Sequence, residues 1–165
     1  MPQVDFTALP DRARAWVFAA ERALTAEERA QLLETVDAFL AQWAAHGVPL
    51  VCGRDWRYDR FLLVAVDEEA AGVSGCSIDA LTRQLKVMED TLGLALLDNG
   101  PVHFRREDHA IERVSRPAFG TLVEKGDVTP EVVVFDNTVP TVGAIRAGKW
   151  ETNAQRTWHG RVFFS

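Results

Sequence analysis

The sequence predicts an α+β protein with a ferredoxin-like core, and three observations favour this class. Segments with strand and helix patterns follow the order strand, helix, strand, strand, helix, strand, which is that of a split β-α-β fold. Both predicted helices are amphipathic, so they can lie antiparallel on one face of a sheet. The third predicted strand is a continuous apolar run, typical of a central strand covered on both faces, or of a strand that a helix covers on one.

The length of 165 residues indicates one domain, or one domain with an appendage. We expect the ferredoxin-like core over residues 1–100 and a C-terminal α/β extension over residues 101–165, packed on the core as one compact unit. Residues 1–13 are expected to form a tether with little structure. The alternation of Trp16 and Phe18 then predicts a half-buried strand.

The first helix has the clearest pattern in the chain. Thr25 and Glu28 match a capping box, in which the Thr side chain and the Glu side chain bond each other's backbone N–H groups. Gly47 and Pro49 are expected to end this helix. Its apolar stripe comprises Leu32, Leu33, Val36, Phe39, Leu40 and Trp43.

The remaining core elements follow in order. Strands are predicted over residues 48–54 and 61–66, and the second amphipathic helix over residues 77–92. Gly93 is expected to end that helix, and residues 94–97 to form the last, short strand of the core.

The extension is less regular. A hairpin is expected around Glu107 and Asp108, followed by a helix that Gly126 ends. The other predicted elements are hairpin strands over 102–106 and 110–115, the helix over 117–125, a buried strand over 131–135, one or two helical turns over 140–148, and a packed tail over 158–164.

Composition restricts the partners and the compartment. The formal net charge of −6 and the absence of a Lys/Arg run disfavour nucleic acid and anionic membranes as partners. No apolar stretch has the roughly 18 residues of a membrane span, and no secretory leader is recognised. The two cysteines are therefore expected to be reduced thiols in the cytoplasm, although a Cys52–Cys76 disulfide stays open. A homodimer is compatible with the sequence, which does not select it.

Cys76 is the main chemical candidate. It lies in the run Gly75-Cys76-Ser77-Ile78-Asp79, between the apolar strand and the second helix. A helix N-terminus favours a thiolate, which is the nucleophilic form of cysteine. The alternative is that these residues only cap the helix, with Asp79 favourable in its first turn.

His159 is the candidate base for this thiol, and it follows Trp158 in the apolar tail. A structural, hydrogen-bonded histidine is the alternative. His103 and His109 do not have the spacing of a metal site. The P-loop-like run at 143–149 is followed by Trp150 instead of Ser or Thr, so a nucleotide site is not predicted. No metal site and no other cofactor is predicted either.

Several segments resemble an uncharacterised family of small bacterial cytoplasmic proteins. The family is marked by a GCSID motif and a C-terminal WHxRxFF-like ending. The resembling segments are 39–47, 61–68, 74–79, 132–137 and 158–164. Some members are labelled as ATPases of ABC transporters, a label that the failed P-loop does not support. The resemblance implies no known activity, and it directs attention to Cys76, Ser77, Asp79, Trp158 and His159.

Three functional hypotheses remain open. The first is a small cytoplasmic domain that binds a small molecule or a protein without catalysis. The second is a thiol-dependent enzyme or redox sensor in which Asp79 or His159 assists Cys76. The third is an anion binder that uses the N–H groups of the same helix N-terminus. The residues expected to bind a ligand are Ser74, Gly75, Ser77 and Trp158.

Overall fold

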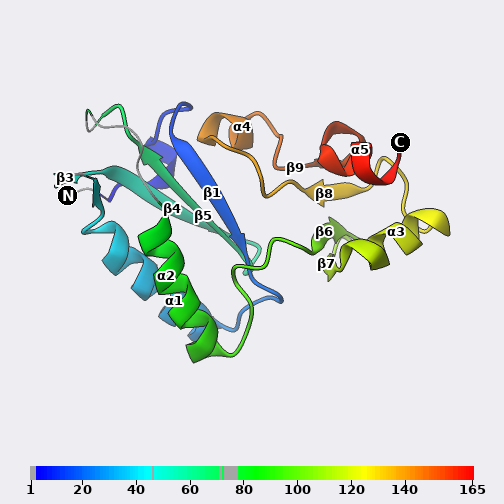
Figure 1. Cartoon of the computed structure of the whole chain (residues 1–165), viewed down its shortest axis with the longest axis horizontal. Coiled ribbons are helices and arrows are strands. Elements are labelled where there is room, and N and C mark those ends of the chain that lie inside the picture. Colours follow the sequence, from blue (N-terminus) through cyan, green and yellow to red (C-terminus); the bar gives the residue numbers. More distant parts are fainter. Residues whose placement is uncertain (1–2, 46, 71, 73–77) are drawn as a thin grey trace. The chain divides into compact units, whose positions relative to one another are not determined.

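The computed structural model describes residues 3–45, 47–70, 72 and 78–165, and it is a mixed α+β structure with antiparallel sheets (Figure 1). The chain divides into two compact units. The first unit comprises Met1–Leu97 and Pro140–Gly143, and the second comprises Asp98–Val139 and Ala144–Ser165. No helix of the described residues is long and apolar enough to cross a membrane.

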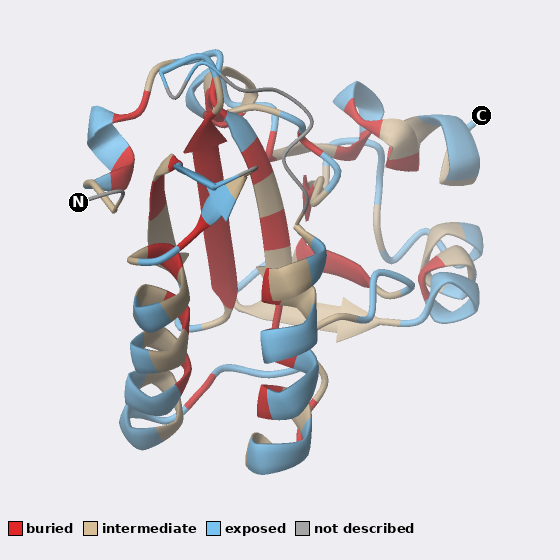
Figure 2. Ribbon diagram, turned by 60° about the vertical axis from the view of Figure 1, so that its left-hand side comes forward, coloured by how far each residue is buried: buried red, intermediate tan, exposed pale blue. Residues whose placement is uncertain are grey.

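A three-stranded antiparallel sheet forms the centre of the first unit. Its order is β1 (Arg14–Ala19), β5 (Phe61–Asp67) and β4 (Val51–Arg57). β4 and β5 are joined as a hairpin, and β5 lies between the other two strands. All seven residues of β5 are buried (Figure 2), so the apolar run of the sequence is a central strand covered on both faces.

Two helices pack on one face of this sheet (Figure 1). They are α1 (Ala26–Leu40) and α2 (Asp79–Leu92). Their buried residues form one apolar cluster with Leu62, Val64 and Val66, which point to the same face of β5 because strand side chains alternate. The predicted capping box of α1 is confirmed, and Gly93 ends α2 in the left-handed region at φ 67°.

The first helix is shorter than its apolar stripe. α1 ends at Leu40, and the next residues turn into a small hairpin of β2 (Ala44–Ala45) and β3 (Val48–Pro49). Trp43 is nevertheless buried, because Leu50 N donates to its carbonyl oxygen at 2.9 Å and holds it at the base of the hairpin. The expected helix end at Gly47 is therefore wrong. Trp43 fits the apolar spacing of the helix and is buried, but it lies after the helix has ended.

Residues 3–13 pack on the first unit, so the expectation that they form a tether with little structure is wrong. The 3-10 helix η1 (Phe6–Ala8) buries Phe6, and Leu9 is buried beside it. Val4 N donates to Cys52 O at 2.7 Å, which holds this segment along β4. Cys52 itself is a buried thiol that donates to Leu40 O at 3.4 Å.

Residues 94–97 do not form the expected fourth strand. The N–H groups of Leu96 and Leu97 donate to the Glu89 carboxylate at 2.8 and 3.1 Å instead of to a strand. These bonds lower the pKa of Glu89 against the opposing effect of its burial, which is the largest influence on that pKa. The edge of β1 meets Pro140 and Thr141 instead, so a complete ferredoxin-like topology is not confirmed.

The second unit contains a four-stranded antiparallel sheet with the order β7-β6-β8-β9. The predicted hairpin is confirmed as β6 (Val102–Arg105) paired with β7 (Ile111–Val114). β8 (Val133–Phe135) and β9 (Glu151–Asn153) complete the sheet.

Short helices contribute to the apolar cluster of the second unit. Phe119 of α3 makes edge-on ring contacts with Phe104 and Phe163, with ring centroids 5.4 and 4.8 Å apart, at the centre of its apolar cluster. Ser115 caps α3, as its hydroxyl accepts from Ala118 N. From Arg116 onward, the helical segments of the chain are α3 (Arg116–Glu124), α4 (Val142–Arg146), η2 (Ala154–Arg156) and α5 (Trp158–Phe163).

Gly53 provides a test of the N-terminal packing. A Cβ at this position would lie 2.6 Å from Val4 O, a backbone atom that cannot move without displacing the segment. We expect Gly53→Ala to lower the free energy of unfolding by about 1–3 kcal/mol, the usual cost of overpacking. Urea unfolding gives this value, and faster hydrogen exchange of the Val4 amide should accompany it.

Gly120→Ala is the matched control, because a Cβ there meets nothing within 4 Å. In a helix this change should be neutral or stabilise by about 0.5–1 kcal/mol. Unchanged stability and unchanged Val4 exchange in Gly53→Ala would contradict the packing described here.

Candidate functional site

The described residues include three of the seven side chains predicted to form a site. Asp79 is the first residue of α2 and is exposed, and Trp158 and His159 begin α5 in the second unit. Ser74, Gly75, Cys76 and Ser77 lie outside the described residues. The pairing of Cys76 with His159, and the use of the residues around Cys76 for a ligand, therefore stay predictions.

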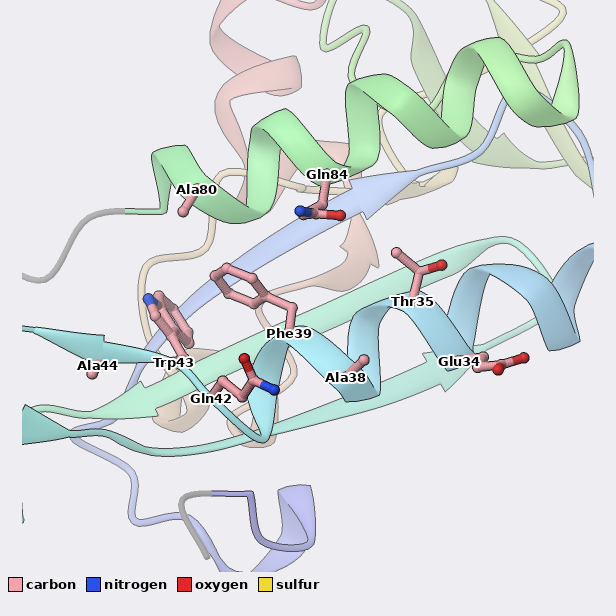
Figure 3. A pocket seen from close by; sticks show the side chains of 9 residues that line it. All are labelled: Glu34, Thr35, Ala38, Phe39, Gln42, Trp43, Ala44, Ala80 and Gln84. Carbon is pink, nitrogen blue, oxygen red and sulfur yellow. The ribbon is translucent and has the colours of Figure 1, made fainter.

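A groove lies between α1 and α2 in the first unit (Figure 3). Thr35 and Phe39 point from α1 toward α2, and Gln84 points back from α2. The rings of Phe39 and Trp43 pack with centroids 5.4 Å apart and supply its apolar wall. The groove has a volume of about 670 Å³ and mixes apolar side chains with exposed amides, without a cluster of reactive groups.

A smaller pocket in the second unit is lined by more charged and polar side chains that can bind a ligand, and we call it the histidine pocket. Its volume is about 290 Å³, near the lower end of the range for small-molecule sites. Two histidines, an arginine and a tryptophan contribute to it. The lining residues are Asp98, Asn99, Pro101, His103, Arg116, Phe135, Asn137, Thr138, Trp158 and His159.

Four separate segments position these side chains. β6 supplies His103, which is 2% exposed, and the first turn of α3 supplies Arg116. The turn after β8 supplies Asn137, and the first turn of α5 supplies Trp158 and His159. α5 begins there because the Thr157 hydroxyl accepts from His159 N at 3.2 Å, as an N-cap residue does.

The Thr157 hydroxyl also contacts the ring of His159. Its oxygen lies 2.7 Å from His159 Nδ1 and 3.1 Å from Ala154 O. A hydroxyl has one hydrogen and a carbonyl oxygen only accepts, so the tautomer that makes both contacts hydrogen bonds has its proton on Nδ1. Nε2 of His159 is then left with a lone pair, and it is the ring nitrogen available to the pocket.

His159 is neutral at neutral pH. Its side chain is nearly completely buried, at 1% exposure. Burial lowers the pKa of His159 from 6.5 to about 4; the charge of Asp136 raises that pKa, and the charge of Arg116 lowers it further. His159 is thus a hydrogen-bond acceptor in this pocket rather than a cation.

Trp158 contacts both His159 and Arg116 through its flat ring. The imidazole of His159 stacks on the indole of Trp158 with centroids 3.8 Å apart and planes 25° apart. The guanidinium carbon of Arg116 lies 4.8 Å from the Trp158 ring centroid, a cation–π geometry. Arg116 Nε donates to Gly100 O at 3.0 Å, which fixes the guanidinium at the pocket.

Asn137 is oriented by Trp150. Trp150 Nε1 lies 2.9 Å from the Asn137 side-chain oxygen, and an indole nitrogen can only donate. The amide oxygen of Asn137 is therefore committed to Trp150, which does not line the pocket. The NH₂ group of Asn137 is the part of the side chain that can donate into it.

Asp98 adds a negative charge that is partly compensated. Its carboxylate is 3.4 Å from Arg113 Nη2. Among the residues that the structure describes, no three His, Cys, Asp or Glu side chains are grouped so as to hold a metal ion. The arrangement includes a cation at Arg116, an amide donor at Asn137 and a neutral imidazole at His159, beside apolar walls.

No family model matches the chain, and neither a curated protein nor a solved structure is found to match it. The resemblance to the family of small bacterial proteins therefore stays a prediction. The site is defined by its geometry alone.

Arg116, Asn137 and Thr157 belong to the site, and sequence analysis did not single them out. Arg116 precedes Pro117 in the chain and starts a helix, a position with no pattern typical of a ligand site. Asn137 lies in a turn-forming Asp-Asn-Thr run, which equally predicts a plain turn. Thr157 could have been found from the sequence, because it directly precedes the candidates Trp158 and His159 and Thr is a common helix N-cap.

The lowered pKa of His159 makes stability depend on pH. The unfolded state takes up a proton near pH 6.5, whereas the folded state resists it until about pH 4. The stabilising effect of neutral His159 is complete above pH 6.5 and is lost as pH falls toward 4. Between pH 7 and pH 4.5, it should contribute a loss of about 2 kcal/mol in the free energy of unfolding.

His159→Asn isolates this effect, because an Asn amide can still donate to Thr157 but does not titrate. The free energies of unfolding of wild type and variant are measured in urea at both pH values, and the wild type should lose more. The same acid loss in both proteins, or an NMR titration of the His159 ring centred near pH 6.5, would contradict the assignment.

Proposed function

We propose that this protein is a cytoplasmic binding protein without catalysis, and that the histidine pocket is where it binds a small molecule. The observation that carries the proposal is a nearly completely buried imidazole whose Nε2 has no hydrogen-bond partner among the described residues, at a pocket of about 290 Å³. A ligand that donates to this nitrogen makes a hydrogen bond that the described residues do not supply.

The ionisation of His159 supports binding over acid–base catalysis. A general base works best when its pKa is near the working pH. The pKa of His159 is about 4, so it is a weak base at neutral pH. Thr157 holds the imidazole in place, and the tautomer with the proton on Nδ1 suits recognition of a hydrogen-bond donor.

The proposal also accounts for the rigid surroundings of the pocket. Asn137 is bonded to Trp150, Arg116 to Gly100, and His159 to Thr157. Side chains that are already fixed lose little conformational entropy when a ligand binds. Such an arrangement can bind a small molecule without rearranging.

The test is a screen of small polar molecules against the full chain, followed by backbone amide NMR. We expect at least one compound to cause saturable shifts at residues of the histidine pocket. Asn99→Trp, which adds a large ring to the exposed part of the lining, should weaken that binding at least about tenfold, since it fills space that the ligand needs.

Lys125→Trp is the control, because Lys125 is exposed and lines none of the hollows described above. It should bind like the wild type. Compounds that shift only residues outside the histidine pocket, or a screen with no pocket shifts, would overturn the proposal.

A further inference from the structure

We infer that the ligand of the histidine pocket is a small organic anion that carries a hydroxyl or N–H group a few atoms from its anionic end. The inference rests on the proposed function and names the chemical class of the ligand. It follows from the groups of Arg116, Asn137 and His159 that remain once the bonds of these three side chains inside the protein are subtracted.

The anionic end is specified by Arg116 and Asn137. Arg116 uses Nε for Gly100 O, and its two Nη groups have no hydrogen-bond partner among the described residues. Asn137 uses its oxygen for Trp150, which leaves its NH₂ group. Both side chains line the pocket, and both can only donate there, one of them with a full positive charge. Carboxylate or phosphate oxygens are the complementary groups.

The donor on the ligand is specified by His159. In the tautomer that makes both Thr157 contacts hydrogen bonds, the proton is on Nδ1 and Nε2 can only accept. A carboxylate placed against Nε2 would meet a lone pair and be repelled. A hydroxyl or N–H at this point of the ligand makes the missing bond.

A cation or a purely apolar molecule fits less well. A cation would face Arg116, and the one carboxylate in the lining, Asp98, is exposed and paired with Arg113. An apolar molecule would leave His159 Nε2 without a bond. Pro101 and Phe135 nevertheless give the pocket apolar walls, which suit a ligand with a small carbon framework.

Three matched probes test the two requirements on the full chain at pH 7. The probe 3-hydroxybenzoate has both the anion and the donor, benzoate lacks the donor, and 3-hydroxybenzamide lacks the charge. Amide NMR titrations should show saturable shifts at the histidine pocket with 3-hydroxybenzoate. Benzoate should bind at least about tenfold more weakly, because it leaves His159 Nε2 unpaired. The amide should also bind at least about tenfold more weakly, because it loses the charge-assisted hydrogen bond with Arg116.

Two variants test which side chains are responsible. Asn137→Asp keeps an oxygen for Trp150 but replaces the donor by a negative charge, so it should abolish binding of 3-hydroxybenzoate. Arg116→Gln should weaken binding at least about tenfold, the effect of losing a charge-assisted hydrogen bond. Arg161→Gln, at an exposed position outside the lining, is the matched control and should bind like the wild type.

The outcomes separate this inference from the proposed function. Equal binding of all three probes, preference for the neutral amide, or no binding of 3-hydroxybenzoate would each overturn the anion class. In any of these cases the proposed function stands if the screen of polar molecules yields another pocket ligand. It falls only if that screen yields none.

Discussion

Complete burial of β5 is the constraint on which the first unit depends. A strand whose seven residues are all buried needs partners on both faces and along both sides. β1 and β4 satisfy its backbone on either side, and α1 and α2 cover one face. Together with Leu62, Val64 and Val66 they form the larger of the two apolar clusters described. Without β5, the apolar residues of α1 and α2 would have no surface to pack against.

The first unit is also not continuous in sequence. Ala15 N donates to Pro140 O at 2.9 Å, and Val142 N donates to Ala13 O at 3.0 Å. A segment that follows most of the second unit in the chain thus completes the first. Contacts so distant in sequence cost more chain entropy to form than those of a local hairpin.

Local patterns predicted the elements that local forces decide. The capping box at Thr25, the Gly93 helix end and the hairpin around Asp108 depend on neighbours a few residues away, and all three are confirmed. The N-terminal packing depends on Gly53, about fifty residues later, and the absent fourth strand depends on a carboxylate in the preceding helix. Periodicity carries no information about such partners.

The site shows the same division. The apolar tail and the family resemblance indicate Trp158 and His159, and both line the histidine pocket. The side chains that give the pocket its polarity come from β6, α3 and the turn after β8, and nothing in the sequence links these segments. Even the state of His159 depends on how a single hydroxyl hydrogen is shared, a matter of geometry rather than of residue type.

The N-terminal segment has one more consequence, for association between copies of the chain. An outer strand with unpaired N–H and C=O groups is a template for pairing with another molecule. Here Gln3 and Val4 bridge to Cys52 on the outer side of β4, and Pro140 and Thr141 bond to the outer side of β1. Both borders of the sheet are therefore occupied by the protein's own irregular segments, and the close approach at Gly53 is what lets the first of them lie there. The lack of a side chain at Gly53 thus helps to cover part of an edge at which strand pairing between copies could begin.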